Sequence, residues 1–224
     1  VAGINAYNFV NGSEMLELSR SSSYIGVLID DLVTKDIQDP YRMLTSRSEY
    51  RLLLRQDNAD ARLTPIGKKV GLIDDAQYKV FTDKQEAIER EMLRIKDAKI
   101  SATDEVNSVL AKVGQNIDRG IKIAELLKRP DIDYSIIKEI DEETKNLNIP
   151  FDVAEQVEIL TKYDGYLKRQ EQQVKEAGKL DKFKIPDHID YSKIEHISSE
   201  TKDKLSKIRP KTLAQASRIG GVKP

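Results

Sequence analysis

The chain has 224 residues, of which 39% are hydrophobic and 33% charged, and its formal net charge is −1. Its length allows one large domain or two small ones. Because the net charge is near zero, any nucleic-acid contact has to come from a local basic patch. The chain has no cysteine, which excludes disulfides, a cysteine-ligated zinc site and a thiol nucleophile. No apolar run approaches the roughly 18 residues that span a bilayer, and we expect no membrane association and a cytoplasmic protein.

The first third of the chain is predicted to contain two helices. Residues 1–10 have the pattern of a helix tail that ends at the Asn11-Gly12 turn. Residues 13–23 are polar and serine-rich, which is typical of a connector. Residues 24–33 are apolar enough for a buried strand, but the spacing of their apolar residues also fits a helix face, and we favour a helix.

The remaining chain is predicted to be helical almost throughout. Residues 74–98 form a long helix by apolar spacing, and shorter periodic runs follow. These runs cover residues 103–112, 117–128, 131–147 and 153–178, and then short helices from Pro186 onward that are separated by Pro210 and Gly220-Gly221. Because no stretch shows sustained alternation of apolar and polar residues, we predict an all-α fold with several helices and a small terminal helical subdomain.

The clearest charge pattern is a run of arginines between residues 42 and 62. Arg47, Arg51 and Arg55 are spaced by four, which on a helix would align them along one face. Arg42 precedes them, and the flanking cations are Arg62, Lys68 and Lys69. Residues 42–71 contain seven basic and three acidic residues, a net of +4, whereas residues 21–40 have a net of −3. The positive charge is therefore concentrated in one segment.

Spacing alone leaves two interpretations of this arginine run open. Arginine presents forked donors that match phosphate oxygens, and three at one-turn spacing could follow a nucleic-acid backbone. Alternatively, Glu49, Asp57 and Asp60 lie close enough in sequence to pair with the arginines along a salt-bridged helix face.

Other patterns point away from catalysis within this chain. The adjacent Asp30-Asp31 pair lies on different helical faces and has no further suitably spaced ligands, so a structural or capping role is favoured over a metal site. His188 and His196 have no cysteine nearby and are expected at the surface. No glycine-rich phosphate-binding loop is present. We predict no catalytic residue, no metal and no cofactor in this chain.

Residues 24–67, YIGVLIDDLVTKDIQDPYRMLTSRSEYRLLLRQDNADARLTPIG, strongly resemble the glucose-inhibited division protein A family, also called GidA or MnmG. The segment KYDGYLKRQ at residues 162–170 is similar to a second motif of that family, as are residues 185–191 and 208–216. The opening VAGINA is similar to the helix that closes the family's FAD domain. The chain also lacks an initiator methionine, and we expect it to be cut from a longer protein.

The resemblance implies that the full protein is a FAD- and NADH-dependent homodimer that works with the GTPase MnmE. Together the two would install a carboxymethylaminomethyl-type group on C5 of the tRNA wobble uridine, using a methylene-tetrahydrofolate carbon. The FAD domain, with its glycine loop and catalytic cysteines, would precede Val1. The helical C-terminal region would bind tRNA and the GTPase.

These implications predict a division into three parts. Residues 1–20 would be a remnant of the FAD domain with a linker, residues 21–184 a helical tRNA-binding domain, and residues 185–224 a subdomain that docks the partner. The expected tRNA contacts are Arg42, Arg47, Arg51, Arg55, Arg62, Lys68 and Lys69, and the expected partner contacts are Arg209, Lys211, Arg218 and Lys223. The alternative is a helical scaffold, or an arm that braces the dimer, without direct tRNA contact.

Overall fold

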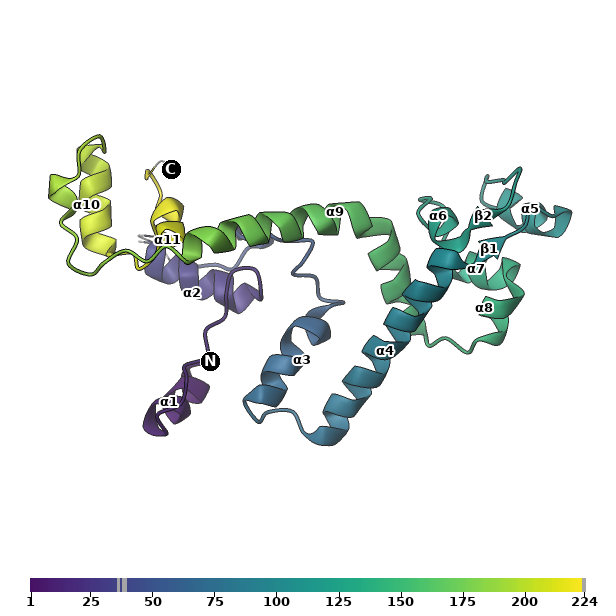
Figure 1. The fold of residues 1–224 in the computed structure, drawn as a ribbon, viewed down its shortest axis with the longest axis horizontal. Coiled ribbons are helices and arrows are strands. Elements are labelled where there is room, and N and C mark those ends of the chain that lie inside the picture. The colour runs from purple at the N-terminus through teal and green to yellow at the C-terminus, as the bar shows by residue number, and fades with distance from the viewer. Residues whose placement is uncertain (36, 38–39, 223–224) are drawn as a thin grey trace. The chain divides into compact units, whose positions relative to one another are not determined.

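The computed structural model describes residues 1–35, 37 and 40–222 of the chain. It is helical apart from one very small sheet, which confirms the predicted all-α class. The chain forms two compact units (Figure 1). The first comprises residues 1–56 and 168–224, and the second comprises residues 57–167. Across the described residues, no helix combines the length and the apolar character needed to cross a membrane.

The first unit contains short helices and the last part of one long helix. Its helices are α1 (Ala2–Val10), α2 (Tyr24–Thr34), the end of α9 (Phe151–Asp181), α10 (Ser199–Ile208) and α11 (Leu213–Arg218), with 3-10 turns at Thr45–Arg47 and Tyr191–Lys193. The α2 helix confirms the helical interpretation of residues 24–33, and the Ser23 hydroxyl caps it by accepting from the amide of Gly26. Gly12 adopts a positive φ of 64° after α1, as expected of a turn glycine.

The end of the chain folds onto its own small apolar cluster within this unit. Tyr191, Leu205 and Ile219 are buried together, although they come from three separate short elements. Backbone hydrogen bonds close the segment, since Ile185 donates to the carbonyl of Lys211 across 2.9 Å. The predicted short helices after Pro186 are therefore present.

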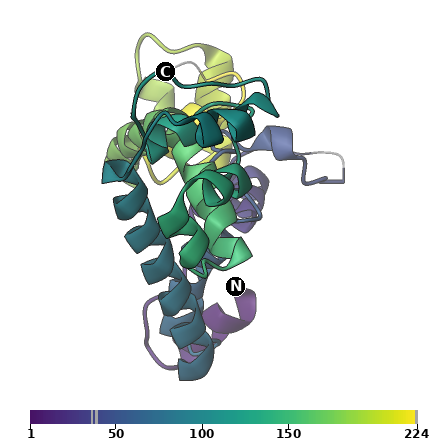
Figure 2. The same cartoon turned by 90° about the vertical axis from the view of Figure 1, so that its right-hand side faces the viewer.

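The second unit packs its helices around the long helix α4. Its elements are α3 (Ala59–Lys69), α4 (Asp75–Asp97), β1 (Lys99–Ile100), α5 (Asp104–Ala111), β2 (Ile121–Lys122), α6 (Ile123–Leu127), α7 (Tyr134–Ile140), α8 (Glu142–Asn146) and the first part of α9. The α3 and α4 helices lie side by side in Figure 1, and the turned view in Figure 2 shows α4 as one continuous helix. Asp74 begins α4 with a reciprocal capping box with Gln77.

The core of the second unit confirms the periodic pattern of the long helix. Ile88 and Ile95, two turns apart on α4, are buried against apolar residues of α6, α7 and α9. Two predicted helices differ in extent. Residues 117–128 are helical only over α6, because residues 121–122 pair antiparallel with 99–100. Residues 131–147 form two helices, because the Asp141 carboxylate caps a new helix by accepting from the amide of Thr144.

The arginine run does not form the predicted helix. Thr45–Arg47 is a single 3-10 turn, Ser48 is extended, and helix α3 begins only at Ala59. The backbone carbonyl of Arg47, which would accept a helical hydrogen bond, instead accepts from Nη2 of Arg20 across 3.0 Å. The prediction that Arg47, Arg51 and Arg55 share one helical face is therefore wrong. We call residues 41–55 the arginine loop.

Candidate nucleic-acid interface

A buried carboxylate anchors the arginine loop to α2. Asp31 is fully buried and accepts hydrogen bonds from Nη1 of Arg20 at 2.7 Å and from the hydroxyl of Tyr41 at 3.0 Å. The ammonium of Lys35 lies 2.8 Å from it, and Nη1 of Arg47 lies 3.6 Å away. Tyr41 and Arg47 belong to the loop, so one charged group holds both to the helix.

Burial alone would raise the pKa of Asp31, because a low-dielectric environment disfavours the charged form. Hydrogen bonds from Lys35 and Arg20 outweigh that effect and hold the pKa of Asp31 below its usual range. The carboxylate is therefore ionised at neutral pH. A buried charge of this kind is stable only while its partners remain in place.

Arg20 connects this carboxylate to the loop and to the rest of α2. Its Nη2 donates to Oε1 of Glu49 at 2.9 Å as well as to the Arg47 carbonyl. Its Nη1 donates to Oδ2 of Asp30 at 3.1 Å and to the carbonyl of Val27 at 3.3 Å. With a 6% exposed side chain, Arg20 serves as an internal hub and not as a surface cation.

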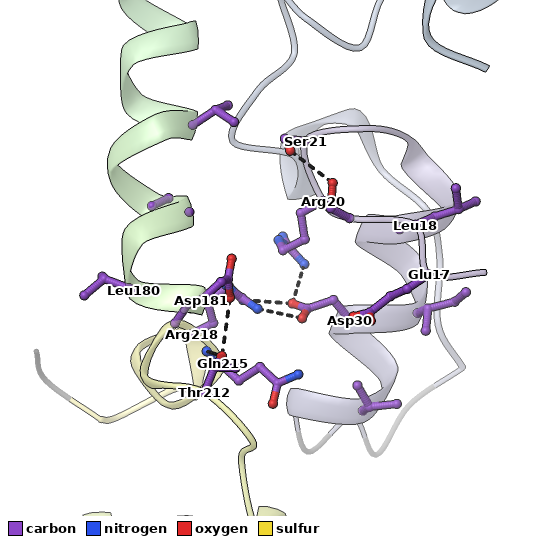
Figure 3. Close-up of a pocket in the computed structure, with 18 of the residues that line it drawn as sticks. Glu17, Leu18, Arg20, Ser21, Asp30, Leu180, Asp181, Thr212, Gln215 and Arg218 are labelled. Carbon is purple, nitrogen blue, oxygen red and sulfur yellow. Dashed lines mark hydrogen bonds and ion pairs between the residues drawn. The ribbon is translucent and has the colours of Figure 1, made fainter. Parts of the chain in front are cut away.

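Asp30 faces a different neighbour from the adjacent Asp31. Arg218 of α11 donates to its two carboxylate oxygens, from Nε at 3.0 Å and from Nη2 at 2.8 Å. Figure 3 shows the Arg20 and Arg218 side chains both reaching Asp30. The structural role predicted for the acidic pair is confirmed, and the adjacency of the two residues lets each hold a different segment.

Four of the seven predicted tRNA contacts lie on the arginine loop. Arg42 and Arg51 are exposed, and among the described residues neither side chain pairs with an acidic group. Arg47 is half-buried, stacks over the Tyr41 ring at 4.6 Å and donates from Nε to the carbonyl of Arg42 at 3.0 Å. Arg55 is half-buried and donates to the carbonyl of Leu52. The loop thus exposes two cations, Arg42 and Arg51, while Arg47 and Arg55 donate hydrogen bonds to its backbone.

The other three predicted contacts belong to the second unit. Arg62 is half-buried and donates from Nε to the Asn58 amide oxygen at 2.9 Å. Lys68 pairs with Asp75 and lies over the Tyr78 ring at 5.9 Å. Lys69 is exposed. Two of the three nearby acids pair with other cations, since Glu49 accepts from Arg20 and Asp60 accepts from Lys84.

The predicted partner contacts differ in their surroundings. Arg209 is exposed, donates to the carbonyl of Ile189 at 3.1 Å and lies 5.8 Å from the Tyr191 ring centre. Lys211 is exposed and pairs with Asp187 at 2.7 Å. Arg218 is only 24% exposed because it is engaged by Asp30. Lys223 lies outside the described residues.

A cavity of about 970 Å³ opens in the first unit between α2, the end of α9 and α11 (Figure 3). Its chemistry does not fit a flavin dinucleotide. Four carboxylates line it, and two of its three cations, Arg20 and Arg218, are engaged by Asp30. Gly26 lies against the backbone of residues 18 and 19 and its amide donates to the Ser23 hydroxyl, so this glycine does not offer a free backbone donor to a pyrophosphate.

The two histidines, His188 and His196, are both exposed, as predicted. Within the part of the chain that the structure describes, no group of three or more metal-ligating side chains is placed to hold an ion.

Sequence reasoning missed Arg20, Lys35 and Tyr41 as the residues that organise the loop. Arg20 lies within the serine-rich connector and belongs to no periodic pattern, so nothing local distinguishes it. The Asp30-Asp31 pair was the only available signal, because a double carboxylate on an otherwise apolar helix requires cationic partners when it is buried.

Comparison with known protein families identifies matching models over most of the chain. The model described as "tRNA modifying enzyme MnmG/GidA C-terminal helical domain" matches residues 75–171. The model described as "tRNA modifying enzyme MnmG/GidA C-terminal helical bundle" matches residues 173–224.

Individual relatives agree with these models. The chain is 52% identical over 225 residues to the tRNA uridine 5-carboxymethylaminomethyl modification enzyme MnmG of Caldicellulosiruptor saccharolyticus, and 48% identical to that of Bacillus subtilis. All of the chain aligns, but it spans only 36% of the length of each relative. Aquifex aeolicus GidA in its form II crystal matches the whole chain with a TM-score of 0.77 and 39% identity, over 34% of that protein. The chain therefore belongs to the MnmG/GidA family and corresponds to its C-terminal helical region.

Proposed function

We propose that this chain binds tRNA through the arginine loop and positions it for chemistry carried out by another part of the full-length protein. The observation that carries the proposal is the exposure of Arg42 and Arg51 on a loop held to α2 by a buried charge network. A fixed loop presents its guanidinium groups with little loss of conformational freedom on binding. The names of the curated relatives, which describe tRNA uridine modification, support an RNA ligand.

The four loop arginines would act in two ways. Arg42 and Arg51 would donate directly to phosphate oxygens, as forked donors do. Arg47 and Arg55 would support the loop backbone, because each donates to a loop carbonyl. Contacts to phosphate position a nucleic acid without reading its sequence, so recognition of particular tRNAs would require other groups.

The proposal is tested by titrating tRNA into the double variant Arg42→Ala/Arg51→Ala at several salt concentrations. We expect about tenfold weaker binding and a salt slope that flattens by roughly one unit for each lost phosphate contact. The matched control is Arg90→Ala, which removes an exposed arginine of α4 and should change neither quantity. Unchanged affinity and slope in the double variant would favour the alternative, a helical scaffold or dimer-bracing arm.

Residues 185–224 are proposed to form the surface that docks the GTPase MnmE. The exposed Arg209 and Lys211 support this proposal, since both project from the small terminal cluster. A pull-down with and without residues 185–224 tests it, and undiminished capture of the GTPase by the truncated protein would rule it out.

The use of FAD and NADH, the formation of a homodimer and the wobble-uridine chemistry are proposed for the full-length protein. They rest on the family, because the chain spans about a third of the length of its relatives. The same family supports a cytoplasmic location. No residue of this chain is assigned a catalytic role.

A further inference from the structure

We infer that Arg218 is a positioning residue for the arginine loop, acting through Asp30 and Arg20. The inference rests on the proposed RNA-binding role of the loop. It reassigns Arg218 from a partner contact at the surface to an internal link between the end of the chain and the RNA-binding segment.

The first step of the link is the ion pair that holds α11 to α2. Arg218 engages both oxygens of Asp30, a bidentate geometry that fixes orientation as well as distance. The two groups are 24% and 14% exposed, so water screens the pair only partly. A guanidinium with Nε and Nη2 already committed has little capacity left for an external partner.

The second step is the sharing of Asp30 between two cations. Nη1 of Arg20 donates to both Asp30 and Asp31, at 3.1 and 2.7 Å. While Arg218 is bound to Asp30, that carboxylate has two cationic partners, Arg218 and Arg20. Its negative charge is then shared between them, and its attraction for Arg20 is weaker than it would be for a single partner. If Arg218 leaves, Asp30 retains Arg20 as its remaining ion-pair partner among the described residues. The Arg20 guanidinium is then drawn toward Asp30.

The third step connects Arg20 to the loop. The same guanidinium holds the Arg47 carbonyl at 3.0 Å and Glu49 at 2.9 Å, so a shift toward Asp30 weakens these bonds. Near Arg47 the loop has little apolar anchoring, since Leu44 is 54% exposed, whereas Leu54 at the end of the loop is buried at 3% exposure. Polar contacts therefore determine the position of the part of the loop that carries Arg42, and this part leads into Arg51.

Together these contacts couple the terminal segment to RNA binding. Any event that pulls α11 from α2, including docking of a protein on residues 185–222, would loosen the loop and weaken its hold on phosphate. The link begins with a direct bond between Arg218 and Asp30, which are 188 positions apart in the sequence, and it reaches the loop through the Arg20 guanidinium.

The inference is tested with Arg218→Ala, Asp30→Asn and the double variant in the full chain, using tRNA as the probe. We expect Arg218→Ala to weaken binding about fivefold, the size of effect carried by packed side-chain networks. The salt slope should stay unchanged, because no phosphate contact is removed. The double variant should bind more tightly than Arg218→Ala, because Asp30→Asn removes the charge that draws Arg20 away from the loop.

A second measurement does not depend on RNA. Hydrogen exchange of the amides of Leu53 and Leu54, which donate to the Tyr50 carbonyl, reports how firmly the loop is held. These amides should exchange faster in Arg218→Ala, and Arg218→Lys should restore part of the protection. The control Lys193→Ala removes an 82% exposed cation from the same terminal segment and should leave exchange and binding unchanged.

The two measurements separate the inference from the proposed function. Faster loop exchange together with weaker binding supports both. If the wild-type chain fails to bind tRNA but the loop still loosens in Arg218→Ala, the RNA-binding proposal fails, and so does the role assigned to the link in RNA binding. Unchanged loop exchange in Arg218→Ala, or a flattened salt slope, overturns the positioning role, because the first excludes the link and the second indicates a direct phosphate contact.

Discussion

Nη1 of Arg20 lies 2.7 Å from Oδ1 of Asp31, and both side chains are buried, at 6% and 0% exposure. Such a pair costs desolvation energy and is retained only when further hydrogen bonds satisfy both groups. Here the remaining donors and acceptors come from α2 and the arginine loop. The pair therefore ties the loop conformation to the stability of the first unit.

Asp31 should make the stability of the first unit sensitive to acid. Its pKa is lowered in the folded state, so its ionised form contributes stability that is complete above the unfolded pKa of about 3.9 and is lost as pH falls through the folded value. We expect Asp31→Asn to lower the unfolding free energy at neutral pH by about 3 kcal/mol. The variant should also lose less stability than the wild type below about pH 4.

Thermal or denaturant unfolding between pH 2.5 and 7 measures this effect, because this range includes the acidic part of the curve of unfolding free energy against pH. Asp203→Asn is the control, because Asp203 is exposed on α10. If the unfolding free energies of the wild type and Asp31→Asn fall in parallel as the pH drops below about 4, the prediction is contradicted.

Gly26 and Gly165 should respond in opposite directions to alanine. A Cβ at Gly26 would lie 2.1 Å from the carbonyl oxygen of Ser19, and a backbone atom cannot yield as a side chain can. Gly26→Ala should therefore destabilise the first unit by several kcal/mol, on the order of 3. A Cβ at Gly165, within α9, would meet nothing within 4 Å. Gly165→Ala should stabilise the helix by about 0.5–1 kcal/mol.

Paired unfolding curves for the two glycine variants provide the measurement, and each serves as the control for the other. If Gly26→Ala leaves the unfolding free energy unchanged, the connector before α2 can move away from the new Cβ at little cost in stability.

Glu91 should be the most sensitive polar residue in the core of the second unit. It is 3% exposed, it accepts from Arg94 at 2.7 and 2.8 Å, and it accepts from the Tyr134 hydroxyl at 2.6 Å. Glu91→Ala leaves the Tyr134 hydroxyl without its acceptor and removes one carboxylate from Arg94, which keeps Asp141, at an expected cost of about 3 kcal/mol. The neighbouring Glu89→Ala, at an exposed position of the same helix, should change stability by less than about 0.5 kcal/mol.

A spectroscopic measurement can separate electrostatics from packing at this site. Burial, together with the hydrogen bond to Glu91, raises the pKa of Tyr134 well above its usual range. Glu91→Gln keeps the volume but removes the charge, so the pKa of Tyr134 should fall. Ultraviolet titration of the tyrosines detects this change, and a Tyr134 titration identical to that of the wild type would argue against a charge effect.

Local patterns in the sequence were sufficient to predict most helices. Apolar residues at three- and four-residue spacing predicted α4 and α9, since burial on one helical face requires that period whatever the neighbour. The resemblance of residues 24–67 to the GidA family also depended on sequence alone, and the family comparison confirmed it. Patterns of this kind depend only on residues that are close to one another in the sequence.

Only the tertiary structure decided the conformation of the arginine loop. The four-residue spacing of Arg47, Arg51 and Arg55 fits a helix, but Arg20 captures the Arg47 carbonyl from 27 residues away and replaces the helical hydrogen bond. Likewise, the sequence marked Arg218 as a surface cation, and its pairing with Asp30 depends on how α11 folds back onto α2. A buried charge pairs with an opposite charge that the fold brings close in space. The spacing of residues along the chain does not give that distance, so the pairing could not be predicted from the sequence.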